Sequence, residues 1–189
     1  MTIRIFTTGG TFDKLYFDAK SEFHIGEPIM ADLLVEANVN FDYKIESILK
    51  KDSLDMGQAD RQLIQEKVES SLENRILIAH GTDSMVDTAK VLTGIENKTI
   101  VLFGAMQPAR IRYSDALYNL GVATSAVQLL SPGVYLAMNG QIFDPDKVRK
   151  NRAENRFEPI ESWFYSVSIC YSSYTLRVGT DMYCRSPGG

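Results

Sequence analysis

The sequence predicts a three-layer α/β domain, in which helices cover both faces of a mostly parallel sheet. Short runs of β-forming residues alternate with longer segments of helical period through most of the 189 residues. The central runs are apolar throughout, which is typical of parallel strands that are buried on both faces. The length corresponds to about one domain and suffices for a sizeable core.

Five segments have the composition of strands. They are the ranges 2–7, 43–49, 76–79, 99–103 and 134–138. The first is followed by Gly9 and Gly10, which permit a sharp break in the chain. Residues 12–26 are polar and aromatic without a clear period, so we expect a loop there. Asp13 and Lys14 are interpreted as charges of that loop.

Four segments have helical periodicity and lie between the expected strands. They are the ranges 27–37, 57–72, 84–93 and 115–130. The second has the clearest apolar face, which consists of Leu63, Ile64, Val68 and Leu72. Ser114 is a suitable N-cap for the last helix, because its hydroxyl can accept a hydrogen bond from the backbone.

The composition argues against several classes of function. A net charge of −4 and a pI of about 5.2 leave no electrostatic footprint for nucleic acid or for an anionic membrane. The two cysteines and two histidines are scattered and form no zinc pattern, so we expect neither a metal nor an organic cofactor. No apolar run approaches ~18 residues and no signal segment is visible, so we interpret the protein as cytoplasmic.

The last 28 residues differ in composition from the rest. The range 162–189 contains both cysteines, the only tryptophan, four tyrosines and six serines, but only three charged residues. We therefore divide the chain into a catalytic domain, 1–161, and an atypical tail, 162–189. The tail is interpreted as a non-native or poorly ordered extension, and a short β-hairpin that packs on the domain is the alternative.

Two polar clusters follow expected strands, at residues 8–13 and 80–83. The carboxyl ends of parallel strands meet at one edge of a sheet, which is where such folds bind ligands. Neither cluster matches a dinucleotide-binding, P-loop or G-x-S-x-G motif, so hydroxyl chemistry remains. Thr11 and Thr82 are the candidate hydroxyls. The alternatives are that Thr11 only caps a turn and that Asp83 or Ser84 only caps a helix.

Together these clusters resemble the two signature motifs of the bacterial-type L-asparaginase family. The motifs are Thr-Gly-Gly-Thr at 8–11 and His-Gly-Thr-Asp-Ser-Met at 80–85. Further stretches resemble the family in the same order, namely 104–106, Pro108, 114–116, 119–120, 138–139 and 148–150. The similarity extends over roughly residues 3–158, and the second motif is specific.

The resemblance implies the family's N-terminal α/β domain without its smaller C-terminal domain, as in a short-form asparaginase. In long-form members, a glutamate from the C-terminal domain of the partner subunit completes the substrate pocket, and this chain shows no counterpart. Because family sites lie at subunit contacts, we expect self-association as a homodimer or homotetramer. No nucleic acid or membrane partner is expected.

The resemblance also assigns catalytic roles. Thr11 would attack the side-chain amide and form an acyl-threonine intermediate, and Thr82 would orient the hydrolytic water. Lys150, paired with Asp83, would ease deprotonation of a threonine; a lysine must be neutralised by its surroundings to act as a base. Tyr16 would lie near the nucleophile, as a loop tyrosine does in the family. Lys147 competes with Lys150 for its role, but the Val-x-Lys context favours Lys150.

Further residues match the family's substrate pocket. Gly10 would let the substrate approach the backbone closely. Ser53 would donate to the α-carboxylate, and Asp83 would accept from the α-ammonium. Leu54 stands where long-form members commonly carry glutamine, which removes one polar contact and predicts a raised KM. His80 is expected to pack behind its loop, hydrogen-bonded to backbone, rather than to act as a base.

The leading hypothesis is therefore an amidohydrolase that converts L-asparagine into L-aspartate and ammonia, with L-glutamine as an open second substrate. One alternative is an amino-acid-binding or inactive homologue of the family. The other is a subunit of a tRNA-dependent amidotransferase, which shares this domain.

Overall fold

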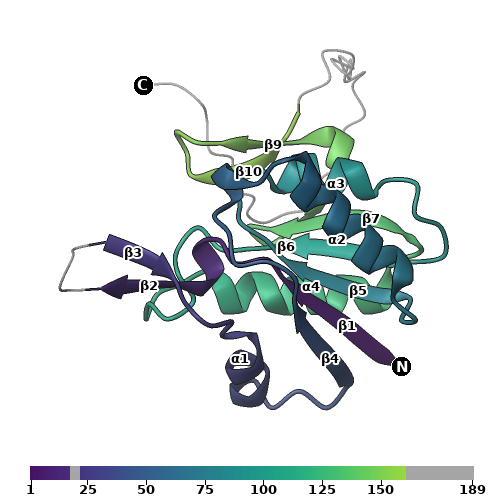
Figure 1. The fold of residues 1–189 in the computed structure, drawn as a ribbon, viewed down its shortest axis with the longest axis horizontal. Coiled ribbons are helices and arrows are strands. Elements are labelled where there is room, and N and C mark those ends of the chain that lie inside the picture. Colours follow the sequence, from purple (N-terminus) through teal and green to yellow (C-terminus); the bar gives the residue numbers. More distant parts are fainter. Residues whose placement is uncertain (18–21, 161–189) are drawn as a thin grey trace, which may run out of the picture.

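The computed structural model describes residues 1–17 and 22–160, and it is built around a six-stranded sheet (Figure 1). The strand order is β4-β1-β5-β6-β7-β8, in which the first five strands are parallel and β8 runs antiparallel to β7. The bounds are β1 Thr2–Thr7, β4 Asp42–Ser47, β5 Arg75–Ala79, β6 Thr99–Phe103, β7 Gly133–Met138 and β8 Gln141–Phe143. The expected mostly parallel sheet is confirmed.

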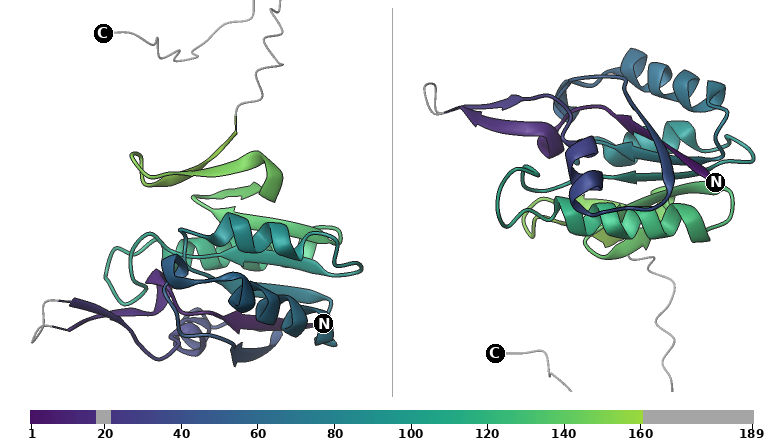
Figure 2. Two further views of the ribbon diagram at one scale, coloured as in Figure 1. Left: turned by 45° about the horizontal axis from the view of Figure 1, so that its top comes forward. Right: turned by 90° about the horizontal axis from the view of Figure 1, so that it is seen from below.

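Four helices cover the two faces of the sheet (Figure 2). They are α1 Met30–Glu36, α2 Gln58–Ser70, α3 Met85–Leu92 and α4 Ala116–Leu129. In β5, Leu77 packs with residues of α1 and α4, whereas Ile76 and Ile78 pack with residues of α2 and α3. A strand can present apolar side chains to both faces only when both are covered, which is why residues 76–79 of β5 and 100–103 of β6 are all apolar. The three-layer arrangement is confirmed.

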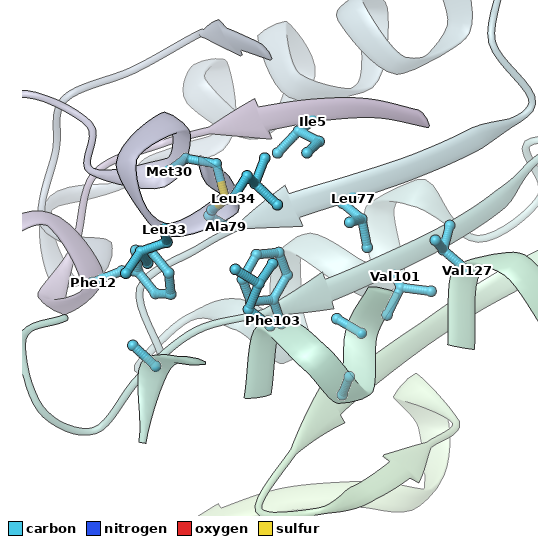
Figure 3. Close-up of a cluster of buried hydrophobic side chains, with 14 of the residues drawn as sticks. Ile5, Phe12, Met30, Leu33, Leu34, Leu77, Ala79, Val101, Phe103 and Val127 are labelled. Atoms are coloured by element: carbon cyan, nitrogen blue, oxygen red, sulfur yellow. The ribbon is translucent and has the colours of Figure 1, made fainter. Parts of the chain in front are cut away.

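The core beneath α1 and α4 reaches the carboxyl edge of the sheet (Figure 3). There the rings of Phe12 and Phe103 meet edge to face, with centroids 5.6 Å apart and planes at 88°. Both side chains are fully buried. Phe12 directly follows Thr11, so the packing of its ring holds the backbone of the candidate nucleophile against the end of the sheet.

Two antiparallel hairpins lie outside the main sheet. One consists of β2 (Lys14–Phe17) and β3 (Glu22–Ile25) and projects from the body, at the left of Figure 1. The other consists of β9 (Val148–Asn151) and β10 (Arg156–Pro159). The expectation of a loop over 12–26 is therefore wrong, because Thr11–Asp13 form a 3₁₀ helix and the hairpin follows it. The second hairpin was not predicted from the sequence.

Three expectations about helices are wrong in detail. The first helix begins at Met30 rather than at residue 27, because Pro28 disfavours helical backbone in the residue before it. Leu72 is 93% exposed, since α2 ends at Ser70. The residue that caps α4 is Asp115, and the Ser114 hydroxyl accepts from Ala116 N–H at 3.0 Å.

Within the described residues, no helix is both long and apolar enough to cross a bilayer. The range 162–189, which the composition separates from the domain, lies outside the described residues, so the division at 161 stays a prediction.

Candidate active site

The candidate site lies where the strand order of the sheet reverses. From β1 the chain goes to β4 on one side, and then returns to β5 on the other side. The loops that follow β1 and β5 therefore leave the same edge of the sheet in opposite directions, at the position where folds of this kind bind ligands. Thr11 is in the first of these loops and Thr82 in the second. The topology thus brings together two motifs that are about 70 residues apart in the chain.

The first loop is a sharp turn that only glycine makes without strain. Gly9 and Gly10 have φ angles of 86° and 78°, in the left-handed region. Thr8 holds the start of the turn, because its N–H and its hydroxyl both donate to Ala79 O, at 3.1 and 3.0 Å. Thr11, half-buried, then begins the 3₁₀ helix. Its backbone is anchored on both sides, by the turn before it and by the buried Phe12 after it.

The loops after β1, β4 and β5 touch each other through glycine. A Cβ atom on Gly10 would lie 2.6 Å from Gly81 Cα, and a Cβ on Gly81 would lie 2.5 Å from Ser53 Oγ. Such distances exclude any larger residue at either glycine. The residue before Thr11 therefore contacts the residue before Thr82, and Ser53 packs directly behind them.

A lysine, a threonine and an aspartate form a connected cluster at this edge of the sheet. Lys150 Nζ donates to Thr82 Oγ1 at 2.8 Å and to Asp83 Oδ1 at 3.0 Å. The Lys150 and Asp83 side chains are only 15% and 23% exposed, and Thr82 is buried. Because the Thr82 hydroxyl accepts from lysine, its own proton is available to another acceptor. The arrangement can hold and orient a polar reactant in a site with little bulk water.

The hairpin β9–β10 places Lys150 in the cluster and leaves Lys147 and Arg149 outside it. Lys147 is 79% exposed and pairs with Asp144 at 3.4 Å. Arg149 pairs with Glu158 on the solvent side. Of the two lysines that competed for the role, only Lys150 contacts Thr82 and Asp83. Arg152, which was not a candidate from the sequence, places Nη2 3.3 Å from the same Asp83 oxygen.

Ser53 is placed by the loop that it faces. Its hydroxyl oxygen accepts from Asp83 N–H at 3.2 Å, and its carbonyl accepts from the Ser84 hydroxyl at 2.6 Å. The proton of the Ser53 hydroxyl has no acceptor among the described residues, so it is free to donate to a bound carboxylate. Ser84 lies at the N-cap position of α3 but makes no capping hydrogen bond with its side chain.

His80 is a structural residue within its loop. Its Nδ1 lies 2.7 Å from Gly81 O, and its Nε2 lies 2.9 Å from Thr88 Oγ1. Complete burial lowers the pKa of the imidazole to about 4. The ring is therefore neutral near pH 7 and both of its nitrogens are engaged, in agreement with the expected packing behind the loop.

Asp13 is not the surface charge expected from the sequence. Its side chain is 1% exposed, with Oδ1 accepting from Ile29 N–H at 3.1 Å and Oδ2 without a partner among the described residues. Burial raises the pKa of the carboxyl to about 6, against a smaller opposing effect of the Ile29 hydrogen bond. Asp13 O also accepts from Gly26 N–H at 2.8 Å, so this residue closes the base of the hairpin β2–β3. Lys14 pairs with Asp52 at 2.6 Å.

Three predicted residues are not joined to the cluster by any described contact. Thr11 lies near it only because the preceding Gly10 packs on Gly81. Tyr16 lies on β2, and its side chain is outside the described part of the structure. Leu54 is 68% exposed and follows Ser53 in a 3₁₀ helix. The raised KM predicted from Leu54 therefore stays a prediction.

Residues that act through packing or through the backbone were not predicted from the sequence. A Cβ on Gly104 would lie 2.3 Å from His80 O and 3.3 Å from Thr82 Cγ2, so this glycine permits the close approach of the two loops. Asn119 is fully buried and bonds to Gly104 O. In the sequence, both residues are unusual for their positions, because Gly104 follows an apolar strand and Asn119 lies inside an apolar helix. Within residues 1–17 and 22–160, no group of three or more His, Cys, Asp or Glu side chains is arranged to hold a metal ion.

The chain matches the family described as "Asparaginase, N-terminal" over residues 2–165. It is 30% identical over 159 residues to a probable periplasmic L-asparaginase of Haemophilus influenzae, covering 78% of this chain and 46% of that protein. It is 36% identical over 102 residues to a glutamyl-tRNA(Gln) amidotransferase subunit of Methanococcus maripaludis, covering 49% of this chain and 24% of that protein.

Solved structures of L-asparaginases are also similar to this chain. The thermostable L-asparaginase from Thermococcus kodakarensis superimposes with a TM-score of 0.74 at 26% identity, over 85% of this chain and 51% of that one. A probable cytoplasmic L-asparaginase from Campylobacter jejuni gives a TM-score of 0.73 at 26% identity, over 83% and 53%. The chain thus spans less than half the length of the two curated relatives and about half that of these two solved chains.

Proposed function

This chain belongs to the asparaginase family, and we propose that it is an amidohydrolase that converts L-asparagine and water into L-aspartate and ammonia. The observation that carries the proposal is the contact of Lys150 Nζ with both Thr82 Oγ1 and Asp83 Oδ1, beside the turn that presents Thr11. A lysine that is bonded to a buried hydroxyl can relay protons during acyl transfer.

In the proposed first step, the Thr11 hydroxyl oxygen attacks the side-chain amide carbon of asparagine. A threonine is a weak nucleophile unless a neighbour takes its proton. The C–N bond breaks, the amide nitrogen leaves as ammonia with that proton, and an ester of Thr11 remains. Backbone N–H groups of the turn at Gly10 are suited to stabilise the negative charge that develops on the carbonyl oxygen.

In the second step, water attacks the ester, aspartate leaves and Thr11 is restored. Thr82 is suited to position this water, because Lys150 occupies one lone pair of its hydroxyl and the proton remains free. Asp83 holds the lysine in place from the other side. The two carbonyl-addition steps thus use neighbouring hydroxyls on two loops that touch.

The substrate carries two charges, and the site offers a partner for each. The Ser53 hydroxyl can donate to the α-carboxylate. Asp83 can accept from the α-ammonium through Oδ2, since Lys150 and Arg152 both contact Oδ1. The β2–β3 hairpin would bring Tyr16 towards the bound amide, as the family resemblance implies.

Self-association is also part of the proposal. The asparaginases to which this chain is similar are about twice as long, and the family resemblance places their sites at subunit contacts. A homodimer or homotetramer would be detected by light scattering of the purified protein. A fully active monomer would contradict this part of the proposal.

The test is ammonia release from L-asparagine and, separately, from L-glutamine. Thr11→Ala should abolish release while the circular dichroism spectrum is retained. Thr124→Ala is a matched control, because Thr124 lies on α4 and its hydroxyl bonds only to Leu120 O among the described residues. Binding of asparagine by calorimetry without any ammonia release would instead favour an amino-acid-binding homologue.

One observation favours a second candidate, a subunit of a tRNA-dependent amidotransferase. It is the 36% identity to the amidotransferase protein of Methanococcus maripaludis, which is higher than the identity to the Haemophilus influenzae relative. This alignment is shorter, however, and covers only 24% of the amidotransferase protein. The candidate predicts preference for glutamine and a requirement for a partner protein, so free-standing hydrolysis of asparagine would exclude it.

A further inference from the structure

The hairpin β9–β10 depends on contacts with the rest of the protein to place Lys150 within hydrogen-bonding distance of Thr82. It forms a two-stranded sheet of its own, and an isolated two-stranded hairpin has little intrinsic stability. Two of its side chains, Val148 and Phe157, are buried in the core. Apolar burial is non-directional, so it holds the hairpin on the body but does not by itself fix how far along its axis each residue lies.

A directional contact does fix that position. Phe157 N–H donates to the side-chain oxygen of Asn139 at 2.8 Å. Phe157 is the cross-strand partner of Lys150 in the hairpin. The hydrogen bond therefore ties the residue opposite Lys150 to the turn between β7 and β8.

The same asparagine is tied to the other half of the cluster. Asn139 N–H donates to the side-chain oxygen of Asn119 at 3.1 Å, and Asn119 Nδ2 donates to Gly104 O at 3.0 Å. Gly104 packs against His80 and Thr82. Asn119 Nδ2 also donates to Asp115, whose carboxylate accepts from the N–H groups of Met106 and Gln107. One hydrogen-bond network thus touches both the strand that carries Lys150 and the loop behind Thr82.

We propose that Asn139 is a positioning residue that holds Lys150 against Thr82, with buried Asn119 as its anchor on the body. The function of this contact rests on the proposed amidohydrolase activity, but its geometry does not. Asparagine suits the position for two reasons. Its φ angle of 53° lies in the left-handed region, which asparagine tolerates better than most residues, and its side chain supplies the acceptor.

The decisive variant is Asn139→Gly, because glycine keeps the backbone conformation and removes only the acceptor. Asn155→Gly is the matched control. Asn155 lies in the turn of the same hairpin, has a φ angle of 49° and makes no side-chain hydrogen bond within the described residues. Both variants add the same backbone freedom, so any difference between them reports the acceptor.

We expect Asn139→Gly to lower kcat for L-asparagine about 10- to 100-fold, because small displacements of a catalytic group are costly, with KM within about twofold. Asn139→Asp, which keeps the acceptor, should retain most of the activity, and Asn155→Gly should behave as wild type. Equal kcat values for the two glycine variants would overturn the proposal. If Asn139→Gly does not fold, Asn119→Ala provides the comparison, with Thr124→Ala as its control on the same helix, because it removes the group that accepts from Asn139 N–H and leaves the backbone at residue 139 unstrained.

A second measurement does not depend on activity. Acetylation of Lys150 by acetic anhydride, followed by mass spectrometry, should proceed several-fold faster in Asn139→Gly than in Asn155→Gly, because the lysine is released from Thr82 and Asp83. Equal rates would contradict the positioning role. Absence of ammonia release from the wild-type protein would count against the proposed function alone, since the acetylation experiment would still decide this inference.

Discussion

Two clusters at opposite ends of β5 contain the same kinds of group but are hydrogen-bonded differently. At the amino end, the Glu73 carboxylate accepts from Lys44 Nζ at 2.8 Å, from the Ser71 hydroxyl at 2.7 Å and from Arg4 Nε at 3.1 Å. At the carboxyl end, Lys150 donates to the Thr82 hydroxyl as well as to Asp83. Each cluster thus combines a lysine, a hydroxyl and a carboxylate.

The direction in which the hydroxyl bonds separates the two clusters. The Ser71 hydroxyl donates to the carboxylate, so its proton is committed and Glu73 is saturated by its neighbours. The Thr82 hydroxyl accepts, so its proton remains available to a reactant. Similar side chains therefore form a saturated clamp at one end of the strand and, at the other end, a hydroxyl with an available proton at the edge where such folds bind ligands.

Among variants of these two clusters, the largest effect should come from Lys150→Ala. If the carboxyl-end cluster is catalytic, the rate of ammonia release should fall by about 10²–10⁴, the range typical of a lost proton-transfer group. Lys147→Ala, in the neighbouring exposed position, should leave the rate unchanged. The measurement is kcat for L-asparagine. A Lys150→Ala protein with wild-type kcat would show that the carboxyl-end cluster, like the amino-end one, is not catalytic.

In contrast to Lys150→Ala, Glu73→Gln should lower the stability of the protein and leave kcat unchanged. Hydrogen bonds, first from Lys44 and then from Ser71, lower the pKa of Glu73 to about 2. A carboxyl whose pKa is lower in the folded state stabilises the fold above its ordinary value of 4.5 and loses this contribution as the pH falls from about 4.5 to about 2.

We therefore expect Glu73→Gln to lower the free energy of unfolding at pH 7 by about 1–3 kcal/mol, measured with urea, because two cationic partners lose a carboxylate. The difference from wild type should shrink as the pH approaches 3. A similar loss at every pH would mean that packing, and not charge, is responsible.

Asp13 should affect the pH dependence of stability in the opposite direction to Glu73, which Asp13→Asn tests. Burial raises the pKa of Asp13 to about 6 from an ordinary value of 3.8. Its contribution to stability is therefore complete below about pH 4 and is lost as the pH rises through about 6. Between pH 4 and pH 7, the wild type should lose about 1–3 kcal/mol of unfolding free energy relative to Asp13→Asn.

The prediction for Asp13→Asn concerns how the free energy of unfolding changes with pH, and not its absolute value. The reason is that the asparagine amide also changes the hydrogen bonding around residue 13. Arg110 and Lys50 oppose the raised pKa. Their replacement by alanine should therefore steepen the slope. Parallel stability curves for wild type and Asp13→Asn would show that the carboxyl is ionised throughout.

The smallest effect should come from Arg152→Ala. Arg152 is 70% exposed, and such ion pairs contribute about 0–1 kcal/mol. Because Arg152 contacts the carboxylate proposed to receive the α-ammonium, its removal should lower KM for L-asparagine by less than about fivefold and leave kcat unchanged. A large fall in kcat would place Arg152 inside the catalytic cluster.

The sheet and the neighbourhood of its active edge could be predicted from the sequence because both depend on local pattern. The apolar segments 76–79 and 99–103 have the length and composition of strands buried on two faces, and their ends placed the motifs at one edge. The choice of Lys150 over Lys147 rested on family resemblance. Two lysines three residues apart cannot be distinguished by composition alone.

What could not be predicted depends on contacts between distant residues. The sequence indicates a loop charge at Asp13, because nothing near it in the chain shows that Ile29 N–H will bond to it. Leu72 continued the apolar face of a helix that ends at Ser70. The sequence indicates the hairpin β9–β10 only weakly, through the apolar residues Val148 and Phe157 on either side of a turn that contains Asn155. Its position on the domain depends on the distant Asn139.

The separate hairpin has a consequence for the order in which the protein is synthesised. All six strands of the main sheet precede residue 144, so they emerge from the ribosome before Lys150 and its partner strand do. A nascent chain can therefore form the main sheet and present Thr11 and Thr82 before the lysine emerges. The proposed chemistry becomes possible only when the last hairpin closes over the finished sheet, so folding precedes reactivity along the growing chain.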